Sequence, residues 1–210
     1  MRTLELFSGS KSFSQVAGKR GHEVFTSDYI SEYDSDYCVD VMEFDYKKIP
    51  YIPDVIWASP PCTAFSVAAI GKNWNRDYTP KHERAELGLR IVAKTIEIIK
   101  YYQKLNPSLI YFIENPRGML RKLPIMNEFN RNTVTYCQYG DTRMKPTDIW
   151  SNSQWTPRPM CKNGDPCHVS APRGSRTGTQ GLKTDYERSM IPSQLFEEIF
   201  DKLEGENEGV

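Results

Sequence analysis

Short apolar runs and longer periodic stretches alternate along this chain. Where apolar residues recur every three or four positions, the pattern predicts an amphipathic helix with one buried face. Runs that are apolar almost throughout predict short strands buried on both sides. The predicted helices are residues 12–19, 85–99 and 191–203, and the predicted strands are residues 3–7, 22–26, 54–58 and 109–113, with weaker candidates at 133–138 and 147–150.

The order of these elements predicts an α/β fold. Strands that alternate with helices form a mostly parallel sheet with helices on both faces. Functional residues of such sheets gather beyond the carboxyl ends of the strands. Gly9, Asp28, Cys62 and Glu114 each follow a predicted strand, so one site can hold all four.

The pattern changes at residue 151. From there to about residue 186 the periodicity disappears, and Pro, Gly, Ser, Thr and Arg dominate. Such a stretch is either a small irregular subdomain or a mobile loop. We therefore expect a core of residues 1–150, a small irregular segment of residues 151–190, and a closing helix with a frayed acidic tail in residues 191–210.

Charge and composition restrict the class of protein. The 27 basic and 27 acidic residues cancel, so any contact with nucleic acid must come from local basic patches. Neither a bilayer-spanning apolar run nor a signal peptide is evident, and we expect no membrane association. Five irregularly spaced cysteines do not fit a secreted disulfide framework, which favours a reducing cytoplasm.

Cys62 is the first candidate for chemistry. It ends the segment Ser59-Pro60-Pro61-Cys62, in which two prolines stiffen the chain directly after a strand. A thiolate at this position could act as a nucleophile if its surroundings or a base remove the proton. The alternative is a small buried hydrophobe, which is the commoner role of a free cysteine.

Two carboxylates are further candidates. Glu114 follows a buried strand, where packing explains a charge poorly, and with a raised pKa it could donate a proton. Its alternative is a strand-end side chain in water. The turn at Gly9, with Asp28 about twenty residues on, fits a nucleotide-type site in which the acid holds ribose hydroxyls. An ordinary strand-to-helix turn would look similar.

Together these motifs resemble the cytosine-5 DNA methyltransferases. The matching segments are Phe7-x-Gly9, Ser59-Pro60-Pro61-Cys62-x-x-Phe65-Ser66, Glu114-Asn115 and Gln138-Tyr139-Gly140, in the family's order and approximate spacing. The variant Glu-Asn-Pro-Arg-Gly is similar to compact members from phage and prophage genomes, some of which serve in restriction-modification. The resemblance covers roughly residues 1–150, with a fainter match at residues 188–195.

The resemblance implies a Rossmann-like, S-adenosylmethionine-dependent methyltransferase. Cys62 would attack ring carbon 6 of a flipped-out cytosine, and Glu114 would assist at ring nitrogen 3. Carbon 5 would then take the methyl group. The cofactor would contact Phe7, Gly9, Asp28, Asp40 and Pro60.

The same resemblance implies double-stranded DNA as the partner of a protein that we expect to be monomeric. Residues 71–82 would form a loop over the DNA, with Lys72, Asn73 and Arg76 near phosphates. Six basic residues against three acidic ones between residues 151 and 192 indicate the DNA-facing recognition segment. The expected substrate-binding residues are Asn115, Arg117, Arg143, Arg173 and Arg176.

The chain also departs from the family pattern. A non-glycine stands where the first motif has its second glycine, within Ser10-Lys11-Ser12. The family's Gln-x-Arg-x-Arg appears as the run from Arg143 to Lys145, and its recognition domain is much larger than residues 151–186. Two rival classes therefore remain open: an amino-methyltransferase, in which an aromatic residue would replace Cys62, and a non-catalytic DNA-binding descendant. A related methyl donor or an unusual cytosine is a third possibility.

Residues 161–168 include candidate zinc ligands. Cys161, Cys167 and His168 lie close in sequence, but a spacing of six positions with an adjacent histidine is not a standard ligand pattern. Cys137 could join them only through a tertiary contact. On spacing alone, we assign no metal.

Overall fold

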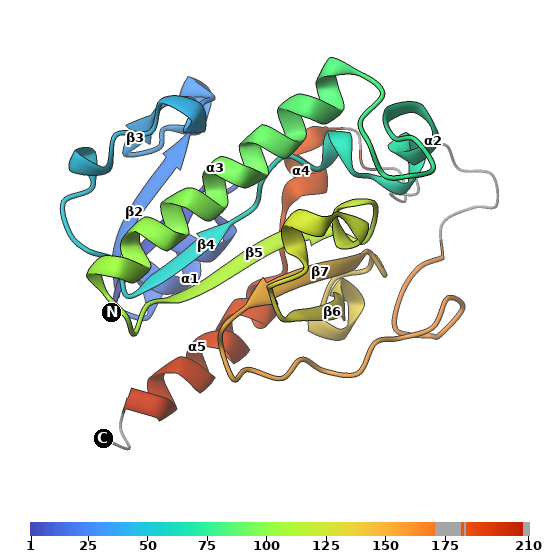
Figure 1. Ribbon diagram of the computed structural model, residues 1–210. Coiled ribbons are helices and arrows are strands. Elements are labelled where there is room, and N and C mark those ends of the chain that lie inside the picture. Colours follow the sequence, from blue (N-terminus) through green and yellow to red (C-terminus); the bar gives the residue numbers. More distant parts are fainter. Residues whose placement is uncertain (171–181, 183, 208–210) are drawn as a thin grey trace.

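A single seven-stranded sheet organises the part of the chain that the structure describes. The computed structural model describes residues 1–170, 182 and 184–207, and its strands run in the order β3-β2-β1-β4-β5-β7-β6 (Figure 1). The predicted residues Arg173 and Arg176 lie outside the described residues. The strands are β1 (Arg2–Leu6), β2 (Glu23–Asp28), β3 (Tyr37–Cys38), β4 (Val55–Ala58), β5 (Ile110–Pro116), β6 (Arg131–Thr135) and β7 (Pro146–Ser151).

The strand directions confirm the expected mostly parallel α/β sheet. β1 pairs in parallel with β2 and β4, and β4 pairs in parallel with β5. β7 lies between β5 and β6 and is antiparallel to both. The strand order reverses between β1 and β4, which is where sheets of this kind bind ligands.

Successive side chains of a strand point to opposite faces of the sheet, and a separate hydrophobic core lies on each face. Leu4 and Leu6 of β1 join the core beneath α3 (Glu83–Leu105), together with Val92 and Ile99 of that helix. On the other face, Val55 and Trp57 of β4 pack against the remaining long helices. These are α1 (Ser12–Lys19) and α5 (Ser193–Asn207), which contact each other (Figure 1). The predicted stripe on residues 85–99 is therefore the buried face of α3.

A cluster of aromatic rings holds α1 and α5 against the sheet. The ring of Phe13 stacks on Trp57 and on Phe200, with centroid distances of 5.7 and 5.2 Å. Phe196 meets the Trp57 ring edge-on at 4.8 Å. Such pairs add to the energy of burying the apolar surface itself, so the C-terminal helix is part of the core.

Several boundaries differ from the sequence prediction. Glu114 lies inside β5 rather than after it, because β5 continues to Pro116 through its pairing with β7. The loop predicted at residues 71–82 includes part of a short helix, α2 (Ile70–Asn73), and a bridge between Trp74 and Pro80. The tail is helical to Asn207, and Glu204 pairs with Arg20, so fraying does not begin at residue 204.

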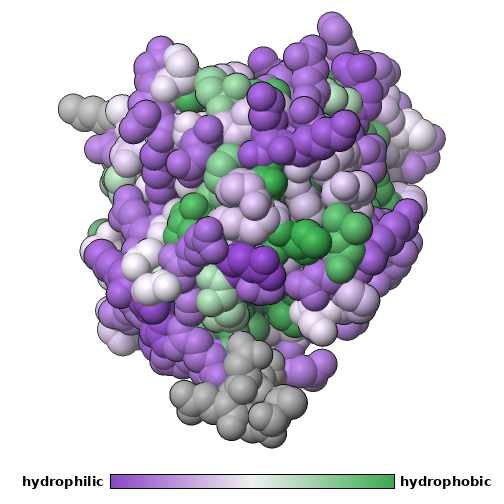
Figure 2. Space-filling model, turned by 90° about the vertical axis from the view of Figure 1, so that its left-hand side faces the viewer, coloured by the Kyte–Doolittle hydropathy of each residue, from purple (hydrophilic) through white to green (hydrophobic). Residues whose placement is uncertain are grey.

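The surface is mostly hydrophilic on the side where β3 forms the sheet edge. Figure 2 shows a small group of hydrophobic residues near the middle of this face, surrounded by hydrophilic ones. Small apolar groups of this kind are normal on the surfaces of globular proteins. Among the described residues, no helix has the length and apolar character needed to cross a membrane.

Candidate active site

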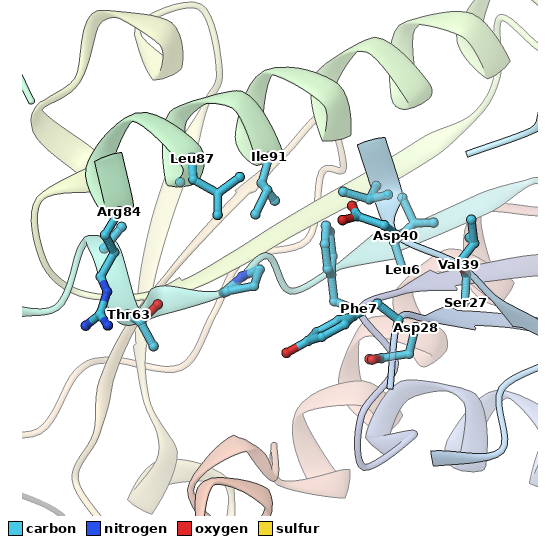
Figure 3. A pocket seen from close by; sticks show the side chains of 15 residues that line it. Leu6, Phe7, Ser27, Asp28, Val39, Asp40, Thr63, Arg84, Leu87 and Ile91 are labelled. Carbon is cyan, nitrogen blue, oxygen red and sulfur yellow. The ribbon is translucent and has the colours of Figure 1, made fainter. Parts of the chain in front are cut away.

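A cavity opens where the strand order reverses. It has a volume of about 330 Å³ and lies between the ends of β1, β2 and β4 and the first turns of α3. Figure 3 shows Phe7, Asp28 and Asp40 on the sheet side, with Leu87 and Ile91 approaching from α3. Polar groups at one end and apolar side chains along another wall are typical of small-molecule sites.

Asp28 joins the cavity to the turn after β1. One carboxylate oxygen accepts a hydrogen bond from the Gly9 backbone N–H at 2.9 Å, and the other accepts from that of Ile30 at 3.0 Å. Phe7, Gly9 and Lys11 all have positive φ angles, of 58°, 39° and 54°. Lys11 thus adopts a conformation that glycine takes more easily, in the short stretch where the family's second glycine is missing.

Cys62 begins a single helical turn, Cys62–Ala64, four residues beyond the end of β4. Its neighbours Pro61 and Thr63 both line the cavity. The cysteine is partly exposed. A nucleophile here would therefore lie beside whatever the cavity binds.

Close contacts fix the Cys62 turn in place. Asn115 is fully buried, and its side-chain amide donates to the Pro60 carbonyl at 2.8 Å. A Cβ atom on Gly118 would lie 2.2 Å from the Phe65 carbonyl oxygen, and one on Gly88 would lie 2.6 Å from Ala64 Cβ. Glycine is therefore required at both positions, since neither the backbone carbonyl of Phe65 nor the Cβ of Ala64, which moves only with its backbone, can yield to such overlaps. These contacts join β5 and α3 to the turn.

Glu114 is 5% exposed and lies on β5, the strand next to β4. Its Oε1 accepts a hydrogen bond from the Tyr136 hydroxyl at 3.1 Å. Burial raises the pKa of Glu114 above its ordinary value, while the positive charge of Lys145 and hydrogen bonds from Tyr136 and Ser59 oppose that rise. A buried carboxyl of raised pKa can hold a proton and donate it.

Lys145 links the two candidate catalytic groups. Burial lowers the pKa of Lys145, whereas the negative charges of Glu114 and Cys62 act to raise it. Its ammonium group lies 4.8 Å from the centre of the Tyr136 ring and donates to the Arg188 carbonyl at 2.9 Å. The charges of Cys62 and Glu114 therefore both act on Lys145.

The other predicted substrate residues lie in different surroundings. Arg143 is 8% exposed, and its guanidinium donates to Asp141 and to the carbonyls of Glu187, Arg188 and Met190. With these bonds made, Arg143 holds α4 (Asp185–Ser189) near the core. Arg117 is exposed, and its backbone N–H donates to the Pro146 carbonyl at 2.9 Å.

One residue of the expected DNA-facing loop lies where the sequence prediction did not place it. Asn73, predicted to contact phosphate, is 7% exposed and donates to the Ala64 carbonyl at 3.2 Å. Trp74 donates to the same carbonyl at 2.8 Å. The prediction for Asn73 is therefore wrong, because its amide braces the Cys62 turn from within. Lys72 and Arg76 are exposed.

Sequence reasoning missed the contribution of α3 and the surroundings of Glu114. Of the expected cofactor residues, Phe7, Asp28 and Asp40 line the cavity, whereas Gly9 and Pro60 support its walls through the bonds described above. Leu87 and Ile91, four positions apart beside the main stripe, could have signalled a second apolar patch on α3. Nothing in the local sequence marks Arg84 at the cavity or Tyr136 at Glu114, and the Ser59-Pro60-Pro61-Cys62 motif does not reveal that Ser59 contacts Glu114.

Comparison with known proteins identifies a relative that matches 96% of the chain. The family model described as C-5 cytosine-specific DNA methylase matches residues 1–132. A curated relative, the probable DNA (cytosine-5)-methyltransferase of Frog virus 3 (isolate Goorha), is 31% identical over 222 residues. That match covers 96% of this chain and 99% of the viral protein.

A solved structure shares the fold. The putative DNA modification methyltransferase encoded within an E. coli prophage superposes with a TM-score of 0.52 at 14% sequence identity. The match covers 72% of this chain and 46% of that chain, so the present chain spans about half of its length. The shared architecture confirms the expected methyltransferase fold.

Proposed function

The chain belongs to the C-5 cytosine-specific DNA methylase family, and from that premise we propose that Cys62 and Glu114 carry out the reaction. The enzyme transfers a methyl group from S-adenosylmethionine to carbon 5 of cytosine in DNA. The proposal concerns which side chains do this, and it rests chiefly on the placement of Cys62. Cys62 lies between two residues that line the cavity. The positive charge of Lys145 interacts with both Cys62 and Glu114.

Cys62 supplies the nucleophile. Carbon 5 of cytosine is a poor nucleophile until a group adds to carbon 6, and the Cys62 thiolate forms that bond. The ring electrons then make carbon 5 nucleophilic, and it takes the methyl group. Loss of the proton on carbon 5 and of the Cys62 sulfur restores the aromatic ring and frees the enzyme.

Glu114 draws charge away from the ring as the thiolate adds. Its raised pKa allows it to hold a proton, which it donates to ring nitrogen 3. The Tyr136 hydroxyl fixes the carboxyl orientation through its 3.1 Å hydrogen bond. Asn115 keeps the Cys62 turn next to β5, so it is a positioning residue.

The cavity suits S-adenosylmethionine. A volume of about 330 Å³ falls within the range of small-molecule sites. Asp28 would offer acceptor oxygens to ribose hydroxyls, Asp40 would contact the adenine, and Leu87 and Ile91 would supply apolar contact. When bound, the cofactor would supply an electrophilic methyl group, and Pro61 and Thr63 would contact it next to Cys62.

We further propose that the substrate is a cytosine in double-stranded DNA and that the enzyme acts in the cytoplasm. A base inside a duplex cannot reach Cys62, so the target cytosine must flip out of double-stranded DNA. The five cysteines, none of which forms a disulfide in the part of the chain that the structure describes, favour the reducing cytoplasm. We expect a monomer to act there, which sedimentation with and without duplex DNA would test.

Covalent trapping tests the nucleophile. Fluorine on carbon 5 cannot leave as a proton does, so DNA containing 5-fluorocytosine in the target site should form a denaturation-resistant adduct. Cys62→Ser should abolish this adduct, whereas Cys38→Ser, which changes an exposed thiol, should retain it. An adduct that survives Cys62→Ser would show that the nucleophile is misassigned.

Mass spectrometry of nucleosides from methylated DNA separates the rival functions. An enzyme of the proposed kind yields 5-methylcytosine. Methylation of an exocyclic nitrogen would identify an amino-methyltransferase. If S-adenosylmethionine and DNA both bind without any product, the chain is a non-catalytic descendant, and the roles of Cys62 and Glu114 are withdrawn.

A further inference from the structure

A compact group of potential metal ligands lies outside the candidate active site. The side chains of Cys137, Cys161, Cys167 and His168 offer three sulfur atoms and one ring nitrogen, all within 4.8 Å of one another. Cys137 belongs to the helical turn Tyr136–Tyr139 that follows β6, and the other three belong to the irregular segment after β7. The fold thus assembles the group from distant parts of the chain.

We propose that these four side chains bind one structural zinc ion. In a tetrahedral site with Zn–S near 2.3 Å and Zn–N near 2.0–2.1 Å, ligand atoms lie about 3.5–3.8 Å apart. Three separations in the structure match this: Cys137 Sγ to Cys167 Sγ at 3.6 Å, and His168 Nδ1 to Cys161 Sγ at 3.7 Å and to Cys167 Sγ at 3.6 Å. The separation between Cys137 Sγ and Cys161 Sγ is shorter, at 3.1 Å.

The ligand set itself indicates the kind of site. Three cysteines and one histidine occupy all four positions of a tetrahedral zinc, leaving none for water or substrate. Such closed sites stabilise folds rather than catalyse reactions. Sequence spacing assigned no metal here, because Cys137 lies 24 positions before Cys161 and only the tertiary fold brings them together.

Hydrogen bonds around the site hold its two chain segments next to each other. The Cys161 backbone N–H donates to the Thr135 hydroxyl at 3.1 Å, and the Val169 N–H donates to the Thr142 carbonyl at 2.9 Å. The Gln138 side chain approaches Cys167 Sγ at 3.5 Å. Partners of this kind orient ligands around a metal.

The position of the site explains what the ion would do. Between Ser151 and Thr184, the described residues form neither helix nor strand, so little regular structure holds this segment. A zinc ion would fix it to the turn that carries Tyr136, the hydrogen-bond partner of Glu114. The metal would thus join the proposed recognition segment to the catalytic strand.

A disulfide is the competing explanation. The short separation of Cys137 and Cys161 would allow one to form after a small movement. It would leave Cys167 and His168 beside the bond without a role. A disulfide also responds to reductant, whereas a zinc site responds to chelator, so the two are readily separated.

Metal analysis of the purified full-length chain tests the proposal. Protein prepared under reducing conditions should contain about one zinc ion per chain. Replacing zinc by Co²⁺ should give the intense visible absorption and thiolate charge-transfer bands of a tetrahedral sulfur-rich site. Cys161→Ser should lose the stoichiometric zinc, and Cys38→Ser, at an exposed thiol outside the group, should keep it.

Two further measurements guard against a misfolded variant. His168→Cys, which leaves four thiolates, should keep about one zinc ion, because a four-cysteine site is also stable. In the wild-type chain, Cys137, Cys161 and Cys167 should resist alkylation until a chelator is added, while Cys38 reacts throughout. Wild-type protein without zinc and without the cobalt bands would overturn the proposal, as would protection reversed by reductant rather than by chelator.

Discussion

At the scale of single residues, Asp28 has two possible roles. It ends β2 and lines the cavity, where it could bind ribose hydroxyls. It also accepts hydrogen bonds from two backbone N–H groups and so shapes the turn after β1. Each carboxylate oxygen has a second lone pair, so both roles can operate together, and substitution can separate them.

Replacing Asp28 should weaken binding of S-adenosylmethionine. Hydrogen bonds to a charged group contribute about 1.5–3 kcal/mol, so Asp28→Ala should raise the dissociation constant by roughly 10- to 150-fold. Asp28→Asn keeps an oxygen for the Gly9 N–H but removes the charge, so it should show much of the same loss. Calorimetric titration measures both. If Asp28→Asn binds like the wild type, Asp28 only shapes the turn.

At the scale of elements, Glu5 joins β1 to α1. Its side chain is 4% exposed and accepts hydrogen bonds from the backbone N–H groups of Phe13 and Ser14, at 3.4 and 2.9 Å. These groups lie in the first turn of α1, where N–H groups lack partners within the helix. Burial nevertheless raises the pKa of Glu5 from 4.5 to about 7, against the opposing effect of the hydrogen bonds.

This pKa predicts how stability changes with pH. Below pH 4.5 the carboxyl is protonated in both states, and between 4.5 and about 7 the unfolded chain releases a proton that the folded chain keeps. The contribution of Glu5 to stability therefore falls as pH rises, by about 3 kcal/mol in all. The Glu5→Gln side chain cannot titrate. The free energy of unfolding of this variant, relative to that of the wild type, should therefore increase by that amount between pH 4.5 and 8. Urea unfolding of both proteins tests this, and a pH-independent difference would contradict it.

The elements also show what sequence can predict. The stripe on α3 and the apolar runs of β1 and β4 were recognised because periodicity reports burial directly. β3 has two residues, too few for a periodic signal, and β5 extends past Ile113 because β7 pairs with it from a distance. Asn73 was misassigned for a similar reason: a polar residue in an aperiodic stretch predicts exposure, and only the tertiary bond to Ala64 reverses that.

In the candidate site, too, the residues that the sequence could predict differ from those that depend on tertiary contacts. Motifs located Phe7, Asp28 and Cys62 because each lies at or just beyond the end of a strand, and the sheet brings strand ends together. Tyr136 was not predicted, and Lys145 was predicted only as a possible substrate residue, because their positions near Glu114 depend on the antiparallel β7 and the turn after β6. The metal ligands likewise depend on a contact between segments far apart in sequence, which spacing rules cannot detect.

At the scale of the whole molecule, sequence recognition requires a segment that presents side chains to the DNA bases. We propose that residues 151–190 read the target, anchored by the zinc site and by the bonds from Arg143 to the carbonyls near α4. Such a short segment can position few side chains at base edges. We therefore expect a target of about two to four base pairs, read through one or two bidentate contacts.

Arg173 and Arg176 are the side chains that we expect to read bases, although they lie outside the described residues. A guanidinium group matches the two acceptors of guanine in the major groove. Loss of a base contact should relax the sequence preference at one position. Loss of a phosphate contact should instead weaken all sites alike and reduce the salt dependence. Bisulfite sequencing of random DNA treated with Arg173→Ala or Arg176→Ala protein distinguishes these outcomes.

The matched control removes a positive charge far from the proposed site. Lys104 is exposed in the last turn of α3. Because α3 begins beside the cavity and runs away from it for 23 residues, that turn lies at the opposite end of the sheet. Lys104→Ala should leave the methylated motif unchanged. If both arginine variants also leave it unchanged, residues 151–190 do not read the target. The exposed Lys72 and Arg76 then become the candidates, because they flank Asn73 and Trp74, which donate to the Ala64 carbonyl in the Cys62 turn.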